Sequence, residues 1–146
     1  MMIREMTIED YEGVYRLWRN TQGMGLNTTD DSRAGIEAYL RRNPNTCFVS
    51  LEEGEMIGTI LSGHDGRRGF IYHLAVSAKH RGRKIGTTLV AKAIEALEKE
   101  GIHKVALVVF EQNEGGNVFW EKLGFTKRED LIYRNKNIVE LTRIDT

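Results

Sequence analysis

The sequence has almost no cysteine and almost no proline, with one of each, Cys47 and Pro44, in 146 residues. A single cysteine excludes a disulfide within the chain. No apolar run approaches the roughly 18 residues that a membrane-spanning helix needs. The first residues, MMIREMTIEDYEG, are too acidic for a signal peptide. We therefore expect a cytoplasmic protein with no membrane partner.

The chain also lacks an excess of charge of either sign, because 21 Lys and Arg side chains are matched by 21 Asp and Glu side chains. A general nucleic-acid binder usually shows a basic surplus, so we expect no nucleic-acid partner. Hydrophobic residues make up 40% of the chain, as is usual for a globular protein, and the length suits one domain with its own core. We therefore expect residues 1–146 to form a single domain.

Hydrophobic periodicity predicts a series of strands and helices. Helical spacing of apolar residues begins after a capping box of Thr7 and Asp10, and a second helix begins at Ser32. The turn sequences Glu53-Gly54 and Asp65-Gly66 join three central strands into a meander. The predicted order is strand 3–6, helix 8–20, loop 21–31, helix 32–42, strands 46–51, 56–62 and 70–76, helix 85–97, strand 103–110, helix 115–123, and strands 125–133 and 137–143.

This element order predicts an α/β (α+β) fold in which a mixed sheet carries helices on both faces. Residues 103–110 read HKVALVVF and are almost continuously apolar, which predicts a strand buried on both faces. Cys47 lies on the predicted strand 46–51, where we expect it to act as a small buried apolar side chain.

Glycine and positive charge occur together where a helix is predicted to begin, in the segment HRGRKIGTTLV from His80 to Val90. A helix start leaves about four backbone N–H groups unpaired, and glycines let a ligand approach them closely. The side chains of Arg81, Arg83 and Lys84 add positive charge. From the pattern alone, an anion site for phosphate or pyrophosphate and an ordinary solvated helix start are both open.

The segment LAVSAKHRGRKIGTTLV resembles the coenzyme A loop of the GNAT superfamily of acetyl-CoA-dependent N-acetyltransferases. The family pattern Arg/Gln-x-x-Gly-x-Gly/Ala reads RGRKIG here, from Arg81 to Gly86, with Lys84 at a position where glycine is usual. A second patch from Asn113 to Phe125, NEGGNVFWEKLGF, matches the asparagine and short helix that follow the fifth strand of the family. The resemblance covers residues 3–143 and is nearest to the small bacterial branch of the family.

The resemblance implies a single-domain, mostly antiparallel sheet whose fourth strand, 70–76, splays from the fifth, 103–110. The pantetheine arm of acetyl-CoA would lie in the gap, and the acetyl group would pass directly to a primary amine in a ternary complex. The Val76 N–H would stabilise the oxyanion that forms at the thioester carbonyl. The implied cofactor-binding residues are Leu74, Ala75, Val76, Arg81, Gly82, Arg83, Lys84, Ile85, Gly86, Thr87, Asn113, Phe119, Trp120 and Lys122. The expected partners are acetyl-CoA and an amine acceptor, without a metal, and a homodimer is expected by similarity only.

His73 is the first candidate for the general base, because an imidazole titrates near neutral pH. Strand alternation places Tyr72 on the opposite face, so we expect at most one of the two to face the cleft. Tyr133 and Glu111 are further candidates. Trp120 stands where many members carry a tyrosine that protonates the leaving thiolate, and an indole N–H is not a practical acid.

Other interpretations stay open. His73 can be a structural residue, and a non-catalytic acyl-CoA-binding or regulatory module would keep the loop and lose the acid, as Trp120 suggests. A phosphate- or nucleic-acid-binding module built on residues 80–84 is disfavoured by the zero net charge. Asp30 and Asp31 either begin a helix or lie where a cationic amine acceptor would meet them.

Overall fold

The computed structural model describes residues 1–144, and its centre is a five-stranded sheet. The strand order is β1-β3-β4-β5-β6. β1 (Met2–Glu5), β3 (Phe48–Glu52), β4 (Glu55–His64) and β5 (Gly69–Val76) pair antiparallel, whereas β6 (Val105–Ala106) pairs parallel to β5. The prediction of a mixed, mostly antiparallel sheet is therefore confirmed.

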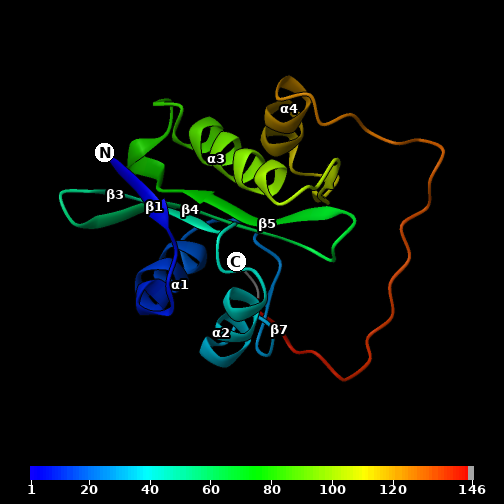
Figure 1. The fold of residues 1–146 in the computed structure, drawn as a ribbon, viewed down its shortest axis with the longest axis horizontal. Coiled ribbons are helices and arrows are strands. Elements are labelled where there is room, and N and C mark those ends of the chain that lie inside the picture. The colour runs from blue at the N-terminus through cyan, green and yellow to red at the C-terminus, as the bar shows by residue number, and fades with distance from the viewer. Residues whose placement is uncertain (145–146) are drawn as a thin grey trace.

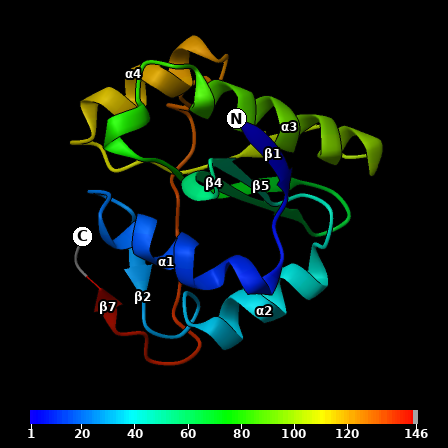
Figure 2. The same cartoon turned by 90° about the vertical axis from the view of Figure 1, so that its left-hand side faces the viewer.

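Helices cover both faces of this sheet, as expected from the element order. Figures 1 and 2 show α1 (Tyr11–Arg19) and α2 (Arg33–Arg42) on one face, and α3 (Ile85–Lys99) and α4 (Glu114–Lys122) on the other. Short 3-10 turns, η1 (Ile8–Asp10) and η2 (Ala78–His80), precede α1 and the loop before α3, and β2 (Leu26–Asn27) pairs antiparallel with β7 (Arg143–Ile144).

The helix starts follow from local hydrogen bonds that the sequence predicts. Ser32 Oγ accepts the Gly35 N–H at 3.0 Å, which caps α2. Asp10 Oδ2 accepts the Thr7 N–H at 2.9 Å, so the first predicted helix begins as a 3-10 turn and continues as α1.

A separate apolar core lies on each face of the sheet. On the α1 side, Val14, Trp18, Cys47 and Val49 are fully buried. Burial raises the pKa of the Cys47 thiol to about 12, so this side chain is the inert apolar group that the sequence predicts. On the α3 side, the buried residues are Phe48, Ile57, Ile60, Ile71, Ile85, Leu89, Val90 and Ala93.

Gly58 brings α3 into close contact with the sheet. A Cβ at this position would lie 3.0 Å from Leu89 Cδ1 and 3.1 Å from Ile85 Cγ2, so any side chain would push the helix outward. Gly58 is also the register partner of Val76. The start of α3 is therefore held above the end of β5.

β5 and β6 pair over only two residues each and then separate. Their register partners are only Gly69 with Val105 and Phe70 with Ala106. Beyond these pairs, residues 107–110 leave the sheet, as the expected splay requires. The prediction of a strand over 103–110 that is buried on both faces is wrong, because only Val105 and Ala106 are strand, and Val108 and Phe110 are 59% and 42% exposed.

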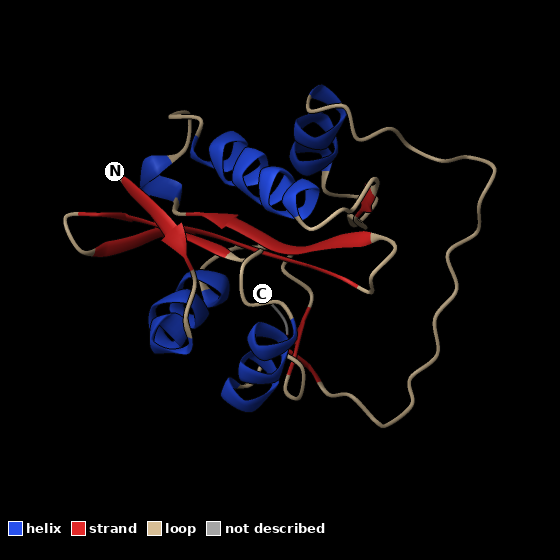
Figure 3. Cartoon of the chain, in the orientation of Figure 1, coloured by secondary structure: helices blue, strands red, loops and turns tan. Residues whose placement is uncertain are grey.

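The two strands predicted over 125–133 and 137–143 are also wrong. Residues 125–142 contain no regular strand and run as a wide arc from α4 to β7 (Figures 1 and 3). A strand needs a hydrogen-bonded neighbour, and the arc runs away from the sheet. Within the described chain only Arg143 and Ile144, which pair with β2, are strand in this region.

We predict that Leu89→Ala lowers the free energy of unfolding by about 2–5 kcal/mol, because Leu89 is fully buried between α3 and the sheet. Ile94→Ala on the same helix is the control, since Ile94 is 39% exposed, and it should cost much less. Urea denaturation of both variants measures the difference. Equal losses would contradict the packing of α3 described above.

Candidate functional site

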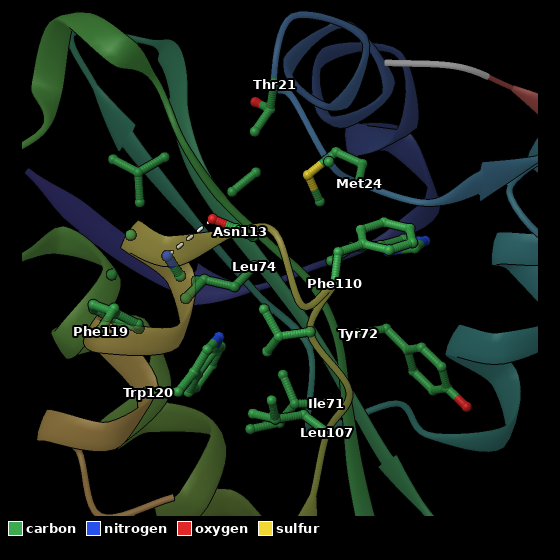
Figure 4. Close-up of a pocket in the computed structure, with 18 of the residues that line it drawn as sticks. Thr21, Met24, Ile71, Tyr72, Leu74, Leu107, Phe110, Asn113, Phe119 and Trp120 are labelled. Atoms are coloured by element: carbon green, nitrogen blue, oxygen red, sulfur yellow. Dashed lines mark hydrogen bonds between the residues drawn. The ribbon is translucent and has the colours of Figure 1, made fainter. Parts of the chain in front are cut away.

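A cleft of about 1100 Å³ opens where β5 and residues 107–110 separate (Figure 4). Phe119 and Trp120 of α4 lie on one side of it, and Thr21 and Met24 of the loop after α1 lie on the other. Most of the lining comes from residues 21–25, residues 70–76 of β5, residues 80–82 and 84–87, residues 107–110, and the region of α4. Tyr133 of the 125–142 arc completes it.

A β-bulge in β5 shapes the centre of the cleft. Tyr72 pairs with Leu61 and Ala75 with Thr59, so Ile60 stands opposite both His73 and Leu74. His73 takes a left-handed backbone conformation, with φ of +50°. The bulge breaks the strand alternation, and Tyr72 and His73 both line the cleft. The expectation that at most one of them faces the cleft was therefore wrong.

The ring of His73 is held by a carboxylate from a distant part of the chain. His73 Nε2 lies 2.7 Å from Asp31 Oδ1, and the two side chains are only 11% and 5% exposed. The ring of Trp18 packs edge-on against the imidazole, with centroids 4.9 Å apart. Asp31 lies just before α2 and His73 lies on β5, so their spacing in the sequence gives no signal for this pair.

Past the bulge, the backbone of β5 presents hydrogen-bonding groups to the cleft. Ser77 N–H donates to Ile57 O at 2.8 Å, which marks these residues as a hydrogen-bonded pair of β4 and β5. Hydrogen-bonding direction alternates along an antiparallel strand. The N–H and C=O of Val76, the preceding residue, therefore point away from β4 and toward the side where the cleft opens.

The loop before α3 makes a second row of backbone donors. Its first helical hydrogen bond runs from Thr88 N–H to Lys84 O at 3.0 Å. The N–H groups of Ile85, Gly86 and Thr87 therefore have no acceptor within the helix, and all three residues line the cleft. Lys84 has φ of +60°, so it occupies the left-handed conformation in which the family pattern places glycine.

The basic side chains of this loop have different surroundings. Arg81 and Lys84 line the cleft. Arg83 instead forms a bidentate pair with Glu52 at the end of β3, with N–O distances of 2.6 and 2.9 Å. His80 Nε2 also lies 3.3 Å from Glu52. The Arg83 hydrogen bonds lower the pKa of Glu52 to about 2, so the pair stays ionised until the pH falls toward that value.

The Asn113 patch builds the wall opposite β5. Asn113 Oδ1 accepts the Gly116 N–H at 2.9 Å and so caps α4 (dashed line in Figure 4). Trp120 packs edge-on between Phe119 and Phe125, with ring centroids 5.1 and 5.0 Å away. A Cβ on Gly86 would lie 3.3 Å from Phe119 Cζ, which shows how closely α3 and α4 approach each other here.

The cleft gathers most of the residues that the sequence singled out. Arg83 and Lys122 lie outside its lining. Tyr72, His80 and Phe110 also line the cleft, although they were not among the expected site residues. Burial is the main cause that raises the pKa of Tyr72, and the nearby Tyr133 and Asp30 add to it. The predicted site residues in the lining are His73, Leu74, Ala75, Val76, Arg81, Gly82, Lys84, Ile85, Gly86, Thr87, Asn113, Phe119, Trp120 and Tyr133.

No group of three or more His, Cys, Asp or Glu side chains in residues 1–144 is arranged to hold a metal ion. None of the helices in the same range is both long enough and apolar enough to cross a membrane.

Comparison with known proteins shows what this fold and cleft are similar to. An acetyltransferase of Photorhabdus laumondii is 35% identical over 142 residues, which cover 96% of this chain and 98% of the relative. An acetyltransferase of Sodalis glossinidius is 31% identical over 140 residues, with coverage of 96% and 97%. Both relatives therefore match along nearly their whole length.

Solved structures share the fold at lower sequence identity. Ard1 from Thermoplasma volcanium has a TM-score of 0.76 at 24% identity, with 86% of this chain and 82% of that chain covered. The PaiA N-acetyltransferase from Thermoplasma acidophilum, solved in complex with coenzyme A, has a TM-score of 0.74 at 20% identity, with 99% and 98% covered.

The model of the acetyltransferase (GNAT) family matches residues 11–125, which is well over half of the chain. This match agrees with the relatives above 30% identity and with the splayed sheet. The chain therefore belongs to the acetyltransferase (GNAT) family, whose members are acyltransferases that use acetyl-CoA.

Proposed function

We propose that residues 1–146 act as a single N-acetyltransferase domain. It moves the acetyl group of acetyl-CoA to a primary amine of a small molecule or a peptide. The observation that carries this proposal is the cleft between β5 and residues 107–110, which runs to the start of α3. An extended cofactor with phosphates at one end fits a cleft that has a strand edge at one end and a helix start at the other.

The proposed cofactor position follows from the free backbone donors. The pantetheine arm pairs with Leu74, Ala75 and Val76 like an added strand. The pyrophosphate lies against the unpaired N–H groups of residues 85–87, where the helix dipole is positive. Asn113, Phe119 and Trp120 close the other wall, and Arg81, Gly82 and Lys84 lie beside the phosphates.

In the proposed reaction, the free amine attacks the thioester carbonyl within the ternary complex. A C–N bond forms, the C–S bond breaks, and the thiolate of coenzyme A leaves. The Val76 N–H stabilises the oxyanion of the intermediate. His73 takes a proton from the attacking nitrogen, and Tyr133 offers a second ionisable group in the cleft.

Trp120 cannot serve as the general acid, but the reaction does not require one. Its indole N–H donates hydrogen bonds and does not release a proton at these pH values. A thiolate whose conjugate acid has a pKa near 8.5 leaves without full protonation. We therefore propose that Trp120 packs against the cofactor within the aromatic wall formed with Phe119 and Phe125.

The direct test is an assay of thiol release from acetyl-CoA with a panel of amines and peptides. The proposal predicts release that requires both the acetyl donor and an amine. Tight acetyl-CoA binding without amine-dependent release across the panel would favour the non-catalytic acyl-CoA-binding module that Trp120 suggests. Failure to bind acetyl-CoA would contradict both the N-acetyltransferase and the acyl-CoA-binding module.

We predict that Gly86→Glu weakens coenzyme A binding at least about tenfold, because it places a carboxylate beside the proposed pyrophosphate position. The new side chain would also press on Phe119, since a Cβ already lies 3.3 Å from that ring. Ala91→Glu adds the same charge to an exposed part of α3 outside the cleft and should bind normally. Calorimetric titration with coenzyme A compares the two, and equal affinities would count against the placement of the phosphates.

Arg83 is better suited to ordering the loop than to touching the phosphates. Its guanidinium is engaged by Glu52, and it lies outside the cleft lining. We propose that this pair, together with His80, holds residues 80–86 in the conformation that presents the helix start.

Glu52→Gln should therefore speed amide hydrogen exchange in residues 80–86 by about two- to fivefold, the range expected when a surface ion pair is lost. Glu53→Gln removes a neighbouring exposed carboxylate that has no ion pair among the described residues, and it serves as the matched control. Exchange that is the same in both variants would show that Glu52 does not order the loop.

The cytoplasmic location, the absence of a nucleic-acid or membrane partner, and the homodimer stay predictions. The acceptor amine is also unassigned, since one fold serves many acceptors. We propose that the acceptor amine binds near the cleft residues outside the proposed cofactor position. These are Thr21, Gln22, Gly23, Met24, Gly25, Tyr72 and Tyr133.

A further inference from the structure

The pair formed by Asp31 and His73 has no part in the proposed binding of the cofactor. His73 nevertheless lines the cleft, and the side chains of His73 and Asp31 are only 11% and 5% exposed. Burial of a carboxylate is unfavourable unless its oxygens are hydrogen-bonded. A buried carboxylate that is directed at the candidate base therefore requires an explanation.

The carboxylate of Asp31 is fixed on both oxygens. Oδ1 lies 2.7 Å from His73 Nε2, and Oδ2 accepts the Asn27 N–H at 2.8 Å. The Tyr11 hydroxyl donates to the Asp31 carbonyl oxygen at 2.7 Å, which also anchors the backbone. The carboxylate therefore has little freedom to turn away from the imidazole.

This geometry determines where the proton of a neutral His73 resides. A carboxylate only accepts hydrogen bonds, so the ring carries its proton on Nε2. The lone pair then lies on Nδ1, which makes no hydrogen bond to another side chain among residues 1–144. Nδ1 is therefore the nitrogen that can take a proton from an amine.

The backbone conformation supports the same orientation. His73 has a φ of +50°, which is unfavourable for a residue other than glycine and persists only where surrounding contacts hold it. The bulge and the ring of Trp18, whose centroid lies 4.9 Å from that of the imidazole, fix His73 beside Asp31. The site thus holds a strained residue in one orientation.

We infer that Asp31 is the positioning residue of His73. It holds the imidazole in the Nε2–H tautomer and stabilises the imidazolium that forms when Nδ1 accepts the proton of the attacking amine. The proton moves from nitrogen to nitrogen, and Asp31 stays ionised throughout. This inference rests on the proposed function, because it takes His73 as the base of that reaction.

Few other titratable groups surround the pair. Tyr72 on β5 has its ring 6.2 Å from that of His73, and Tyr11 on α1 reaches Asp31 only through the carbonyl. Asp30, next in the chain, accepts from Asn27 Nδ2 at 3.0 Å instead. Asp31 is therefore the carboxylate in direct contact with His73.

A purely structural role for the pair makes a different prediction. The pair ties the loop before α2 to β5, so its loss would loosen the loop whether or not His73 transfers protons. In that case, loss of either partner would break the same contact, so the double variant would show coupling here too. The imidazole tautomer and the split between kcat and KM separate the two roles.

The experiment compares Asp31→Asn, His73→Gln and the double variant in the acetyl-CoA assay over a range of pH. We expect Asp31→Asn to lower kcat about tenfold to hundredfold with little change in KM for acetyl-CoA. The double variant should be no slower than His73→Gln.

Tyr11→Phe tests the structural role, since it removes the hydrogen bond that anchors the Asp31 backbone and keeps the carboxylate. Its imidazole should still carry the proton on Nε2. Nitrogen NMR of the imidazole gives a readout that does not depend on turnover: Nε2–H in the wild type, and a mixture of tautomers in Asp31→Asn.

Multiplying effects in the double variant, an unchanged kcat in Asp31→Asn, or a wild-type imidazole protonated on Nδ1 would each overturn the inference. A wild type without amine-dependent thiol release would instead refute the proposed function. In that case the NMR experiment still decides whether Asp31 sets the tautomer.

Discussion

The separation of β5 from residues 107–110 is the feature on which the rest of the site depends. Pairing stops after Phe70 and Ala106, so the following part of β5 has β4 on one side and a cleft on the other. Backbone groups in a protein interior need hydrogen-bond partners. The open side of β5 is therefore a built-in position for an extended ligand, and a continuous sheet would have none.

Close packing on the α3 side places the helix start beside this open strand. Gly58 lets α3 approach the sheet, and Gly86 lets α4 approach α3. The unpaired N–H groups of α3 and the free edge of β5 consequently line one continuous cleft. Arg81 and Lys84 add positive charge to this cleft, whereas Arg83 is paired with Glu52 outside its lining.

Elements with strong local signals could be predicted from the sequence. Capping at Ser32, the meander turns and the apolar periodicity of α3 gave the right elements, and the RGRKIG segment led to the right family. The strands predicted over 125–133 and 137–143 failed because β-propensity describes a segment and not its neighbour. Residues 125–142 have the composition of strands but no paired strand beside them.

The arrangement inside the cleft depends on contacts between distant residues, which local patterns do not contain. The bulge at His73 shifts the register by one residue and brings Tyr72 to the cleft, against the alternation rule. The partners of His73 and Arg83 come from Asp31 and Glu52, which lie far away along the chain. Electrostatic roles therefore could not be assigned before the fold was known.

The most direct test of this account is a crystal structure of the protein with coenzyme A. The account predicts the pantetheine between Leu74–Val76 and residues 107–109, hydrogen-bonded to the Val76 backbone, with the pyrophosphate on the N–H groups of residues 85–87. Coenzyme A bound outside the cleft, or a β5 edge covered by the chain's own residues 107–110, would contradict it.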